Sequence, residues 1–162
     1  MRLVQLKDSA PITVVIDAGV YAKLFIDETD SDDAVDFFSF ARANQLNLIA
    51  PDLFLYEVLA VAGPSIIGSD LAYEKLIDFQ RAGFRLVSLD NATIRQALTI
   101  SNTGHPKSGF PTFYDSSYHA LAMVSGGVFL TADKRHAAKT SSFGSVALLD
   151  NWQTSFRKSQ AL

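Results

Sequence analysis

The 162-residue chain is predicted to fold as an α/β sandwich of the βαβ type. Two observations predict this fold class: short runs rich in β-branched residues recur along the chain, and segments with helix-start signals alternate with them. A third observation concerns the sheet, because the strand-like runs are nearly continuous in apolar character. Strands covered on both faces by helices have this character, so the sheet is expected to be mainly parallel.

Five runs are predicted to form strands, because each is short, apolar and rich in Val, Ile or Leu. They are ITVVI (12–16), LNLIA (46–50), FRLVSL (84–89), GVFLT (127–131) and SVALL (145–149).

Helix signals lie between these runs. The segment 30–43 opens on acids that suit a helix N-terminus, and 52–62 follows a proline. The segments 69–82 and 90–101 each begin with a residue that can cap a helix. Gly, Pro and Ser make 102–111 a surface connection, after which Pro111 and Thr112 can start the next helix.

Length and composition predict one domain. The chain has no internal repeat and no linker-like break, and its 48% hydrophobic content can supply a core, so residues 1–162 are expected to form one unit with its core at about 12–149. No apolar run approaches the roughly 18 residues of a membrane span. Asp8 and Pro11 interrupt the N-terminal apolar stretches, and there are no cysteines, so a cytoplasmic protein without disulfides or thiolate metal sites is expected.

Two carboxylates stand directly after predicted strands. Asp17 follows ITVVI, and Asp133 lies two residues after GVFLT. Ligands of open parallel sheets bind beyond the carboxyl ends of the strands, so both acids are candidate functional residues. Asp90 and Asp150 also follow strand-like runs, but a helix cap and a short terminal turn account for them.

Glu57 and Asp115 lie within predicted helices. Glu57 sits in LFLYEVLAVA, a helix that is apolar nearly all round and is therefore expected to be buried. A buried unpaired carboxylate is costly, so a basic group or a cation must compensate it. Asp115 falls in the first turn of the helix that starts at Pro111 and Thr112, where complementing the helix dipole is an equally good explanation.

Together, Asp17, Glu57, Asp115 and Asp133 predict a cation site at one sheet edge. Carboxylates without His or Cys prefer a hard divalent cation, Mg²⁺ or Mn²⁺, and the natural substrate of such a site is a phosphodiester. The formal net charge of −3 argues against a nucleic-acid partner, but removing four carboxylates from it leaves +1 for the rest of the chain.

The same residues also resemble a known family. The chain carries, in this order, the segments VVIDAGVYAKLF, LFLYEVLAV, FYDSSYHALA and FLTADKRHA. The ordered set resembles the PIN-domain nucleases, most closely the VapC-type toxins of type II toxin–antitoxin systems, from about residue 12 to 149. The resemblance implies a three-layer α/β/α fold and a Mg²⁺- or Mn²⁺-dependent endoribonuclease. It also implies an RNA substrate, a cognate antitoxin that covers the acidic groove, and a homodimer.

The resemblance implies roles for individual residues as well. Asp17 and Asp115 match the closest metal ligands, while Glu57 and Asp133 would bind through water, orient the nucleophile or hold a second ion. Thr131 matches a hydroxyl that can bond a ligand carboxylate or a phosphate.

One position departs from the family pattern. Gly19 stands where the family often has Ser, Thr or Asn, so metal affinity could be reduced unless Ser116 substitutes.

Cations close to the acids are candidate RNA-phosphate contacts. They are Lys23, Lys134 and Arg135, for each of which a solvated helix face is an equally good explanation.

Other functions stay open beside the nuclease. A noncatalytic PIN-like module that binds RNA or protein would keep the fold with a weakened site at Gly19. A receiver-type phosphoacceptor is disfavoured, because Ala18 and Gly19 replace the acidic pair it needs. No HExxH or GxSxG motif supports a zinc site or a serine hydrolase.

Overall fold

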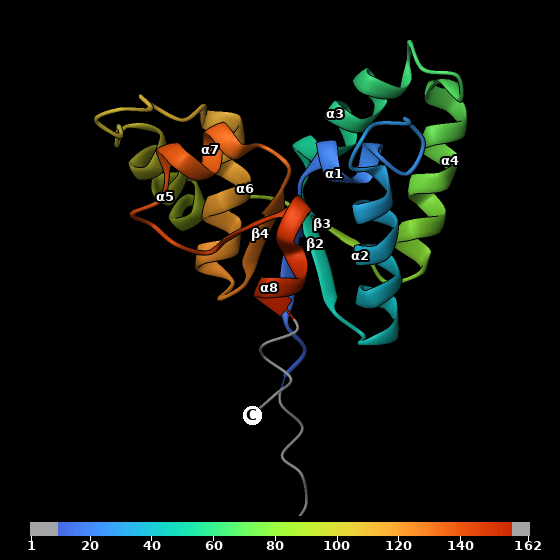
Figure 1. Cartoon of the computed structure of the whole chain (residues 1–162), viewed down its shortest axis with the longest axis horizontal. Coiled ribbons are helices and arrows are strands. Elements are labelled where there is room, and N and C mark those ends of the chain that lie inside the picture. The colour runs from blue at the N-terminus through green and yellow to red at the C-terminus, as the bar shows by residue number, and fades with distance from the viewer. Residues whose placement is uncertain (1–9, 157–162) are drawn as a thin grey trace, which may run out of the picture.

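The computed structural model describes residues 10–156, which form one sheet covered by helices (Figure 1). All neighbouring strands pair in parallel, in the order β3-β2-β1-β4-β5. The strands are β1 (Thr13–Ile16), β2 (Asn47–Pro51), β3 (Arg85–Val87), β4 (Val128–Thr131) and β5 (Val146–Leu148).

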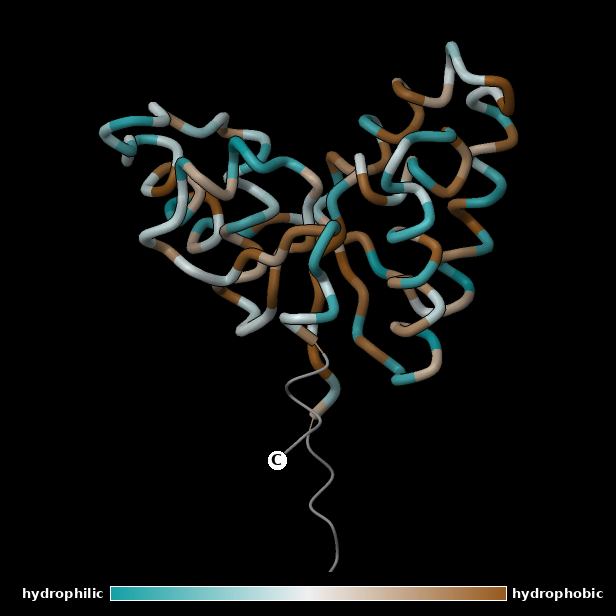
Figure 2. Tube along the Cα trace, in the orientation of Figure 1, coloured by the Kyte–Doolittle hydropathy of each residue, from teal (hydrophilic) through white to brown (hydrophobic). Residues whose placement is uncertain are grey.

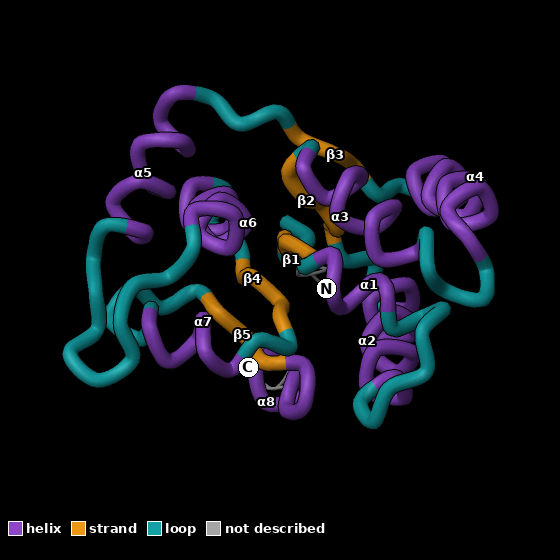
Figure 3. The backbone as a smooth tube through the Cα atoms, turned by 90° about the horizontal axis from the view of Figure 1, so that it is seen from above, coloured by secondary structure: helices purple, strands orange, loops and turns teal. Residues whose placement is uncertain are grey.

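The helices divide between the two faces of the sheet. Figures 1 and 3 show α1 to α4 on one side and α5 to α7 on the other, which gives the expected three layers. The bounds are α1 (Ala18–Ala22), α2 (Ser31–Ala43), α3 (Leu53–Ala62), α4 (Gly68–Arg81), α5 (Asn91–Ser101), α6 (Phe113–Val124), α7 (Lys134–Lys139), the 3-10 turn η1 (Leu149–Asn151) and α8 (Trp152–Phe156). Among the described residues, no helix is long and apolar enough to cross a membrane.

Burial explains the apolar strands. Val14, Val15 and Ile16 of β1 are fully buried, and the tube in Figure 2 is correspondingly brown along the central strands. Helix α2 packs into the core through Phe37, whose buried ring lies 5.6 Å from that of Trp152 in α8. A continuous core on both faces fixes the sheet that carries the site.

The predicted strands and longer helices are confirmed to within about two residues. Thr112 and Asp90 cap α6 and α5 through their side chains, as their positions indicated. The expected cap at Ser69 is wrong: α4 begins one residue earlier, and Ile67 stands before it without a side-chain cap bond. Gly68 instead takes a left-handed turn with φ of 70°, which suits a residue without Cβ.

The strand order places the site. β1 lies in the centre between β2 and β4, and the chain crosses to the other side of the sheet between β3 and β4. The gap between the carboxyl ends of β1 and β4 is therefore the switch point at which open α/β sheets bind ligands. Ile16 pairs with Leu130, so the residues that follow the two strands are neighbours.

Candidate active site

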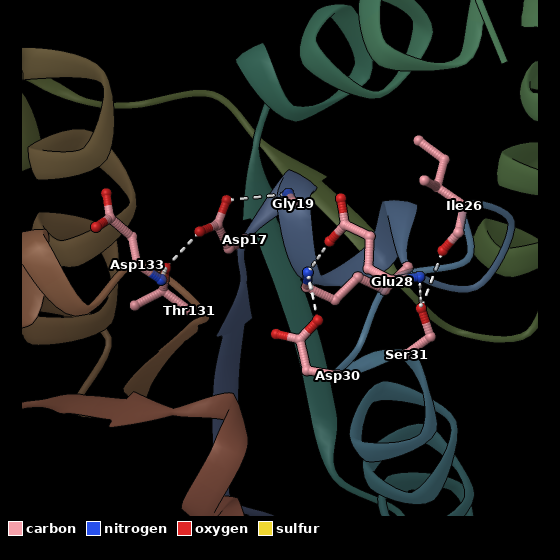
Figure 4. Close-up of polar contacts among 9 residues, drawn as sticks. Asp17, Gly19, Ile26, Glu28, Asp30, Ser31, Thr131 and Asp133 are labelled. Carbon is pink, nitrogen blue, oxygen red and sulfur yellow. Dashed lines mark hydrogen bonds and ion pairs between the residues drawn. The ribbon is translucent and has the colours of Figure 1, made fainter.

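Asp17 lies directly after β1 and caps the N-terminus of α1. Its Oδ1 accepts the Gly19 N–H at 3.1 Å, and its Oδ2 accepts the hydroxyl of Thr131 at 2.5 Å (Figure 4). Thr131 is the last residue of β4 and is fully buried. One donor from α1 and one from the end of β4 thus hold this carboxylate in one orientation.

Asp133 lies beside Asp17 at the same sheet edge. It caps α7, because its Oδ1 accepts the N–H groups of Arg135 at 2.8 Å and His136 at 3.1 Å. Its own N–H donates to the Thr131 oxygen at 3.0 Å. Thr131 therefore contacts both strand-end acids, one through its proton and the other through its oxygen.

Asp115 is held by the cap of its own helix. Thr112 Oγ1 accepts the Asp115 N–H at 3.1 Å and donates to Asp115 Oδ2 at 2.8 Å. The acid lies in the first turn of α6, where the helix dipole favours negative charge.

Glu57 lies in α3, and its burial differs from the expectation. The prediction that α3 is buried all round is wrong: Phe54, Val58 and Ala62 face the core, while Tyr56 is 71% exposed. Glu57 lies between these faces and is partly buried.

The group that compensates Glu57 is neither a basic side chain nor an observed cation. The Tyr118 hydroxyl of α6 donates to Glu57 Oε2 at 2.5 Å. Sequence reasoning did not assign this residue a role. The one available signal was its place three residues after Asp115, on the same face of the helix.

The acids interact electrostatically. Burial, together with the charges of Asp115 and Glu57, raises the pKa of Asp17 to about 6 despite its two hydrogen bonds. Burial and the Asp115 charge raise the pKa of Glu57, while burial and the Asp133 charge raise that of Asp115. The structure therefore brings the four predicted acids into one electrostatic cluster, although they come from four separate elements.

The chemistry of this cluster fits a hard cation. All four groups offer oxygen, and three have a raised pKa, so a divalent cation would relieve both their desolvation and their mutual repulsion. Within residues 10–156, no three His, Cys, Asp or Glu side chains lie close enough together to hold a metal ion by themselves. Mg²⁺ is usually held by one or two carboxylates and several waters, so the set suits such an ion.

A cavity of about 290 Å³ opens beside the two strand-end acids. Asp17, Gly19, Ala132 and Asp133 are among the residues that line it, and Lys23 stands on its wall. A Cβ on Gly19 would meet no atom closer than 3.8 Å, so glycine leaves room here.

The predicted cations differ in their surroundings. The Lys23 ammonium is mostly buried and pairs with Glu28 and, at 2.7 Å, with Asp30 (Figure 4). These bonds outweigh burial and raise the pKa of Lys23.

The other two cations lie on α7. Lys134 is exposed and pairs with Asp150 at 2.7 Å, and Arg135 is exposed.

Ser116 has a different contact from the one considered. It is fully buried, and its hydroxyl donates to the Thr112 carbonyl at 2.6 Å, within its own helix.

Comparisons with known proteins agree with this fold. Residues 14–141 match the model of the PIN domain family. No curated protein matches the chain.

Three solved structures share the fold at low identity. The first is VapC20 of Mycobacterium tuberculosis, described as a toxin that cleaves the sarcin-ricin loop, with TM-score 0.60 and 14% identity over 77% of this chain and 93% of that one. The second is VapBC2 of Rickettsia felis bound to a promoter DNA fragment, with TM-score 0.62 and 9% identity over 85% and 97%. The third is PAE2754 of Pyrobaculum aerophilum, with TM-score 0.57 and 18% identity over 94% and 97%.

The family match covers most of the chain, including all four acids of the cluster. The ordered acidic motifs of the sequence had indicated the same family, and the parallel sheet agrees with it. The chain belongs to the PIN domain family.

Proposed function

We propose that this protein is a Mg²⁺- or Mn²⁺-dependent endoribonuclease and the toxin of a toxin–antitoxin pair. The observation that carries the proposal is the coupled cluster of Asp17, Glu57, Asp115 and Asp133 at the topological switch point of a parallel sheet. Membership of the PIN domain family supports the nuclease, and the VapC proteins that share the fold support the toxin role.

Different residues of the site would have different roles in the proposed reaction. Asp17 and Asp115 would hold the cation directly. Glu57 and Asp133 would bind it through water, hold a second ion or orient the attacking water. Thr131 would keep Asp17 in place, because its hydroxyl is already committed to that carboxylate. When bound, the divalent ion supplies Lewis-acid stabilisation of the charge that develops on the phosphoryl group.

The cavity beside Asp17 and Asp133 would receive the RNA chain. Lys134 and Arg135 are exposed at the start of α7, directly after Asp133, where they could contact neighbouring phosphates. Lys23 already forms ion pairs with Glu28 and Asp30, so it would have to break these pairs to bind a phosphate. Ser116 is the weaker candidate for support, since its hydroxyl serves its own helix.

The proposed partners follow from the same site. An antitoxin would cover the acidic groove and reach it with a basic side chain. We propose a homodimer in the cytoplasm as the working form, in line with the family resemblance.

The test is cleavage of labelled transfer and ribosomal RNA by the purified protein in Mg²⁺, Mn²⁺ or EDTA. We expect cutting with either ion, none in EDTA, and none with Asp115→Asn. Retained cutting by an Asp17→Asn, Asp115→Asn double variant would refute the proposed site.

A second candidate function is a PIN-like module that binds RNA or protein without cutting. Two observations favour it: Gly19 provides no side chain to the site, and in the described part of the chain no three His, Cys, Asp or Glu side chains are placed to hold a metal ion. The absence of Mg²⁺ or Mn²⁺ binding at millimolar concentration would support this alternative.

A further inference from the structure

Tyr118 is a buried polar side chain at the centre of the candidate site. It lies in α6 with 1% of its surface exposed, and its ring stacks on Phe129 of β4 with 5.6 Å between ring centres. Its hydroxyl points away from this packing toward Glu57 Oε2, 2.5 Å away in α3. The ring and the hydroxyl therefore have separate partners. Tyr118→Phe would keep the ring contact with Phe129 and lose the hydrogen bond to Glu57.

The direction of this hydrogen bond follows from its acceptor. A carboxylate oxygen can only accept, so the Tyr118 hydroxyl spends its one proton on Glu57 Oε2.

Through this hydroxyl, Tyr118 connects two elements that carry acids. It belongs to α6, the helix of Asp115, and donates to Glu57 of α3. Within residues 10–156, Tyr118 is the one side chain that donates a hydrogen bond to Glu57, and the Asp115 charge disfavours the charged form of Glu57. Loss of the Tyr118 hydroxyl would therefore leave this carboxylate without a side-chain donor.

We propose that the Tyr118 hydroxyl is a positioning group of the site, which fixes the Glu57 carboxylate beside Asp17 before a divalent cation binds. The inference rests on the proposed function, because it assumes that the acids hold a cation. Such supporting hydrogen bonds typically change metal affinity or activity by about 10- to 100-fold. Tyr118 is expected to act on cation binding through Glu57, and not on the stability of the core.

The test compares Tyr118→Phe with a matched control, Tyr21→Phe. Tyr21 is also buried, but its ring stacks on Phe79 of α4, a helix that carries none of the four acids. Calorimetric titration of the whole protein with Mn²⁺ should show about 10- to 100-fold weaker binding for Tyr118→Phe and unchanged binding for Tyr21→Phe. RNA cleavage by Tyr118→Phe should recover as Mn²⁺ is raised, while its melting temperature without metal should match that of Tyr21→Phe; a clearly lower metal-free melting temperature for Tyr118→Phe would show that the variant loosened the fold instead.

A double-variant cycle locates the effect. If Tyr118 acts through Glu57, Tyr118→Phe should weaken Mn²⁺ binding no further in a Glu57→Gln background. Equal Mn²⁺ affinity of wild type and Tyr118→Phe, additive losses in the cycle, or no Mn²⁺ binding by wild type would each overturn the proposal. Failure of the nuclease proposal alone looks different: wild type would bind Mn²⁺, Tyr118→Phe would bind it more weakly, and neither would cut RNA.

Discussion

The pKa of the Asp17 carboxyl group is set by opposing effects of its surroundings. The Gly19 N–H and the Thr131 hydroxyl favour its charge, yet burial and two neighbouring acids raise its pKa to about 6 from 3.8. The folded state therefore binds a proton between these two pH values that the unfolded state releases. This contribution to stability is complete below pH 3.8 and is lost as the pH rises through about 6.

Replacing Asp17 should reveal this penalty. In metal-free buffer at pH 7 to 8, Asp17→Asn should increase the free energy of unfolding by up to about 3 kcal/mol, an upper bound because Asp17 is partly exposed. The gain should vanish near pH 4. Urea unfolding at a series of pH values measures it, with the exposed Asp36→Asn of α2 as control. A loss of stability with Asp17→Asn at pH 8 would contradict the electrostatic account.

Gly19 offers a gain-of-function test. Its φ is not in the left-handed region, and a Cβ there would lie 3.8 Å from Asp17 Oδ1, so serine fits without strain. The hydroxyl would restore the polar side chain that the resemblance leads one to expect. We predict up to about tenfold tighter Mn²⁺ binding for Gly19→Ser, with Gly19→Ala unchanged. If the two variants bind Mn²⁺ equally, this position does not contribute to the site.

At the scale of elements, the start of α6 combines folding and function. Thr112 caps the helix and donates to Asp115, so Thr112→Ala removes both bonds. We expect a loss of about 1 kcal/mol and a melting temperature about 2 to 4 °C lower, together with weaker Mn²⁺ binding. Thr112→Ser keeps the hydroxyl and should keep both properties; if it fails as Thr112→Ala does, the methyl group matters more than the bonds.

Helices α6 and α7 are joined by two buried histidines. His119 Nε2 lies 2.7 Å from the Gly144 carbonyl, so His119 donates there and accepts at Nδ1 from His136 Nε2, 3.1 Å away. His136 Nδ1 then has no hydrogen-bond partner among residues 10–156. Burial lowers the pKa of both rings, which favours their neutral forms, and the pair holds α7, whose cap is Asp133.

This pair predicts acid sensitivity. Burial lowers the pKa of His119, and burial with the charges of His119 and Lys139 lowers that of His136 to about 4, against the opposing charge of Asp133. As the pH falls from 6.5 toward 4, His136 binds a proton in the unfolded state but stays neutral in the folded state, so the folded state loses stability over this range. His136→Gln keeps an N–H donor and should flatten the decline in urea unfolding; an unchanged slope would contradict the assignment.

Element by element, local patterns predicted most of the fold. The β-branched runs gave all five strands, and Pro111 and Thr112 marked the start of α6. The short helices α1 and α7 were not predicted. Each starts directly after its capping acid, Asp17 or Asp133, and each of these acids closely follows a strand. The one local signal for Tyr118 was its place three residues after Asp115, since its partner Glu57 lies 61 residues away and only tertiary packing joins them.

At the scale of the whole molecule, the strand order explains the site. Local patterns cannot order strands, and the central place of β1 is what makes Asp17 and Asp133 neighbours. Helix α3 from one layer and α6 from the other then bring Glu57 and Asp115 to the same edge (Figure 3). The fold thus gathers like charges that are unfavourable to one another until a cation joins them.

The most direct test of this account is Mn²⁺ titration by calorimetry of wild type, Asp17→Asn and Asp115→Asn. Wild type should bind Mn²⁺, and either substitution should remove most of the affinity. Mn²⁺ should also raise the melting temperature of wild type alone. Binding that survives both substitutions, or its absence in wild type at millimolar Mn²⁺, would show that the four carboxylates are not a cation site.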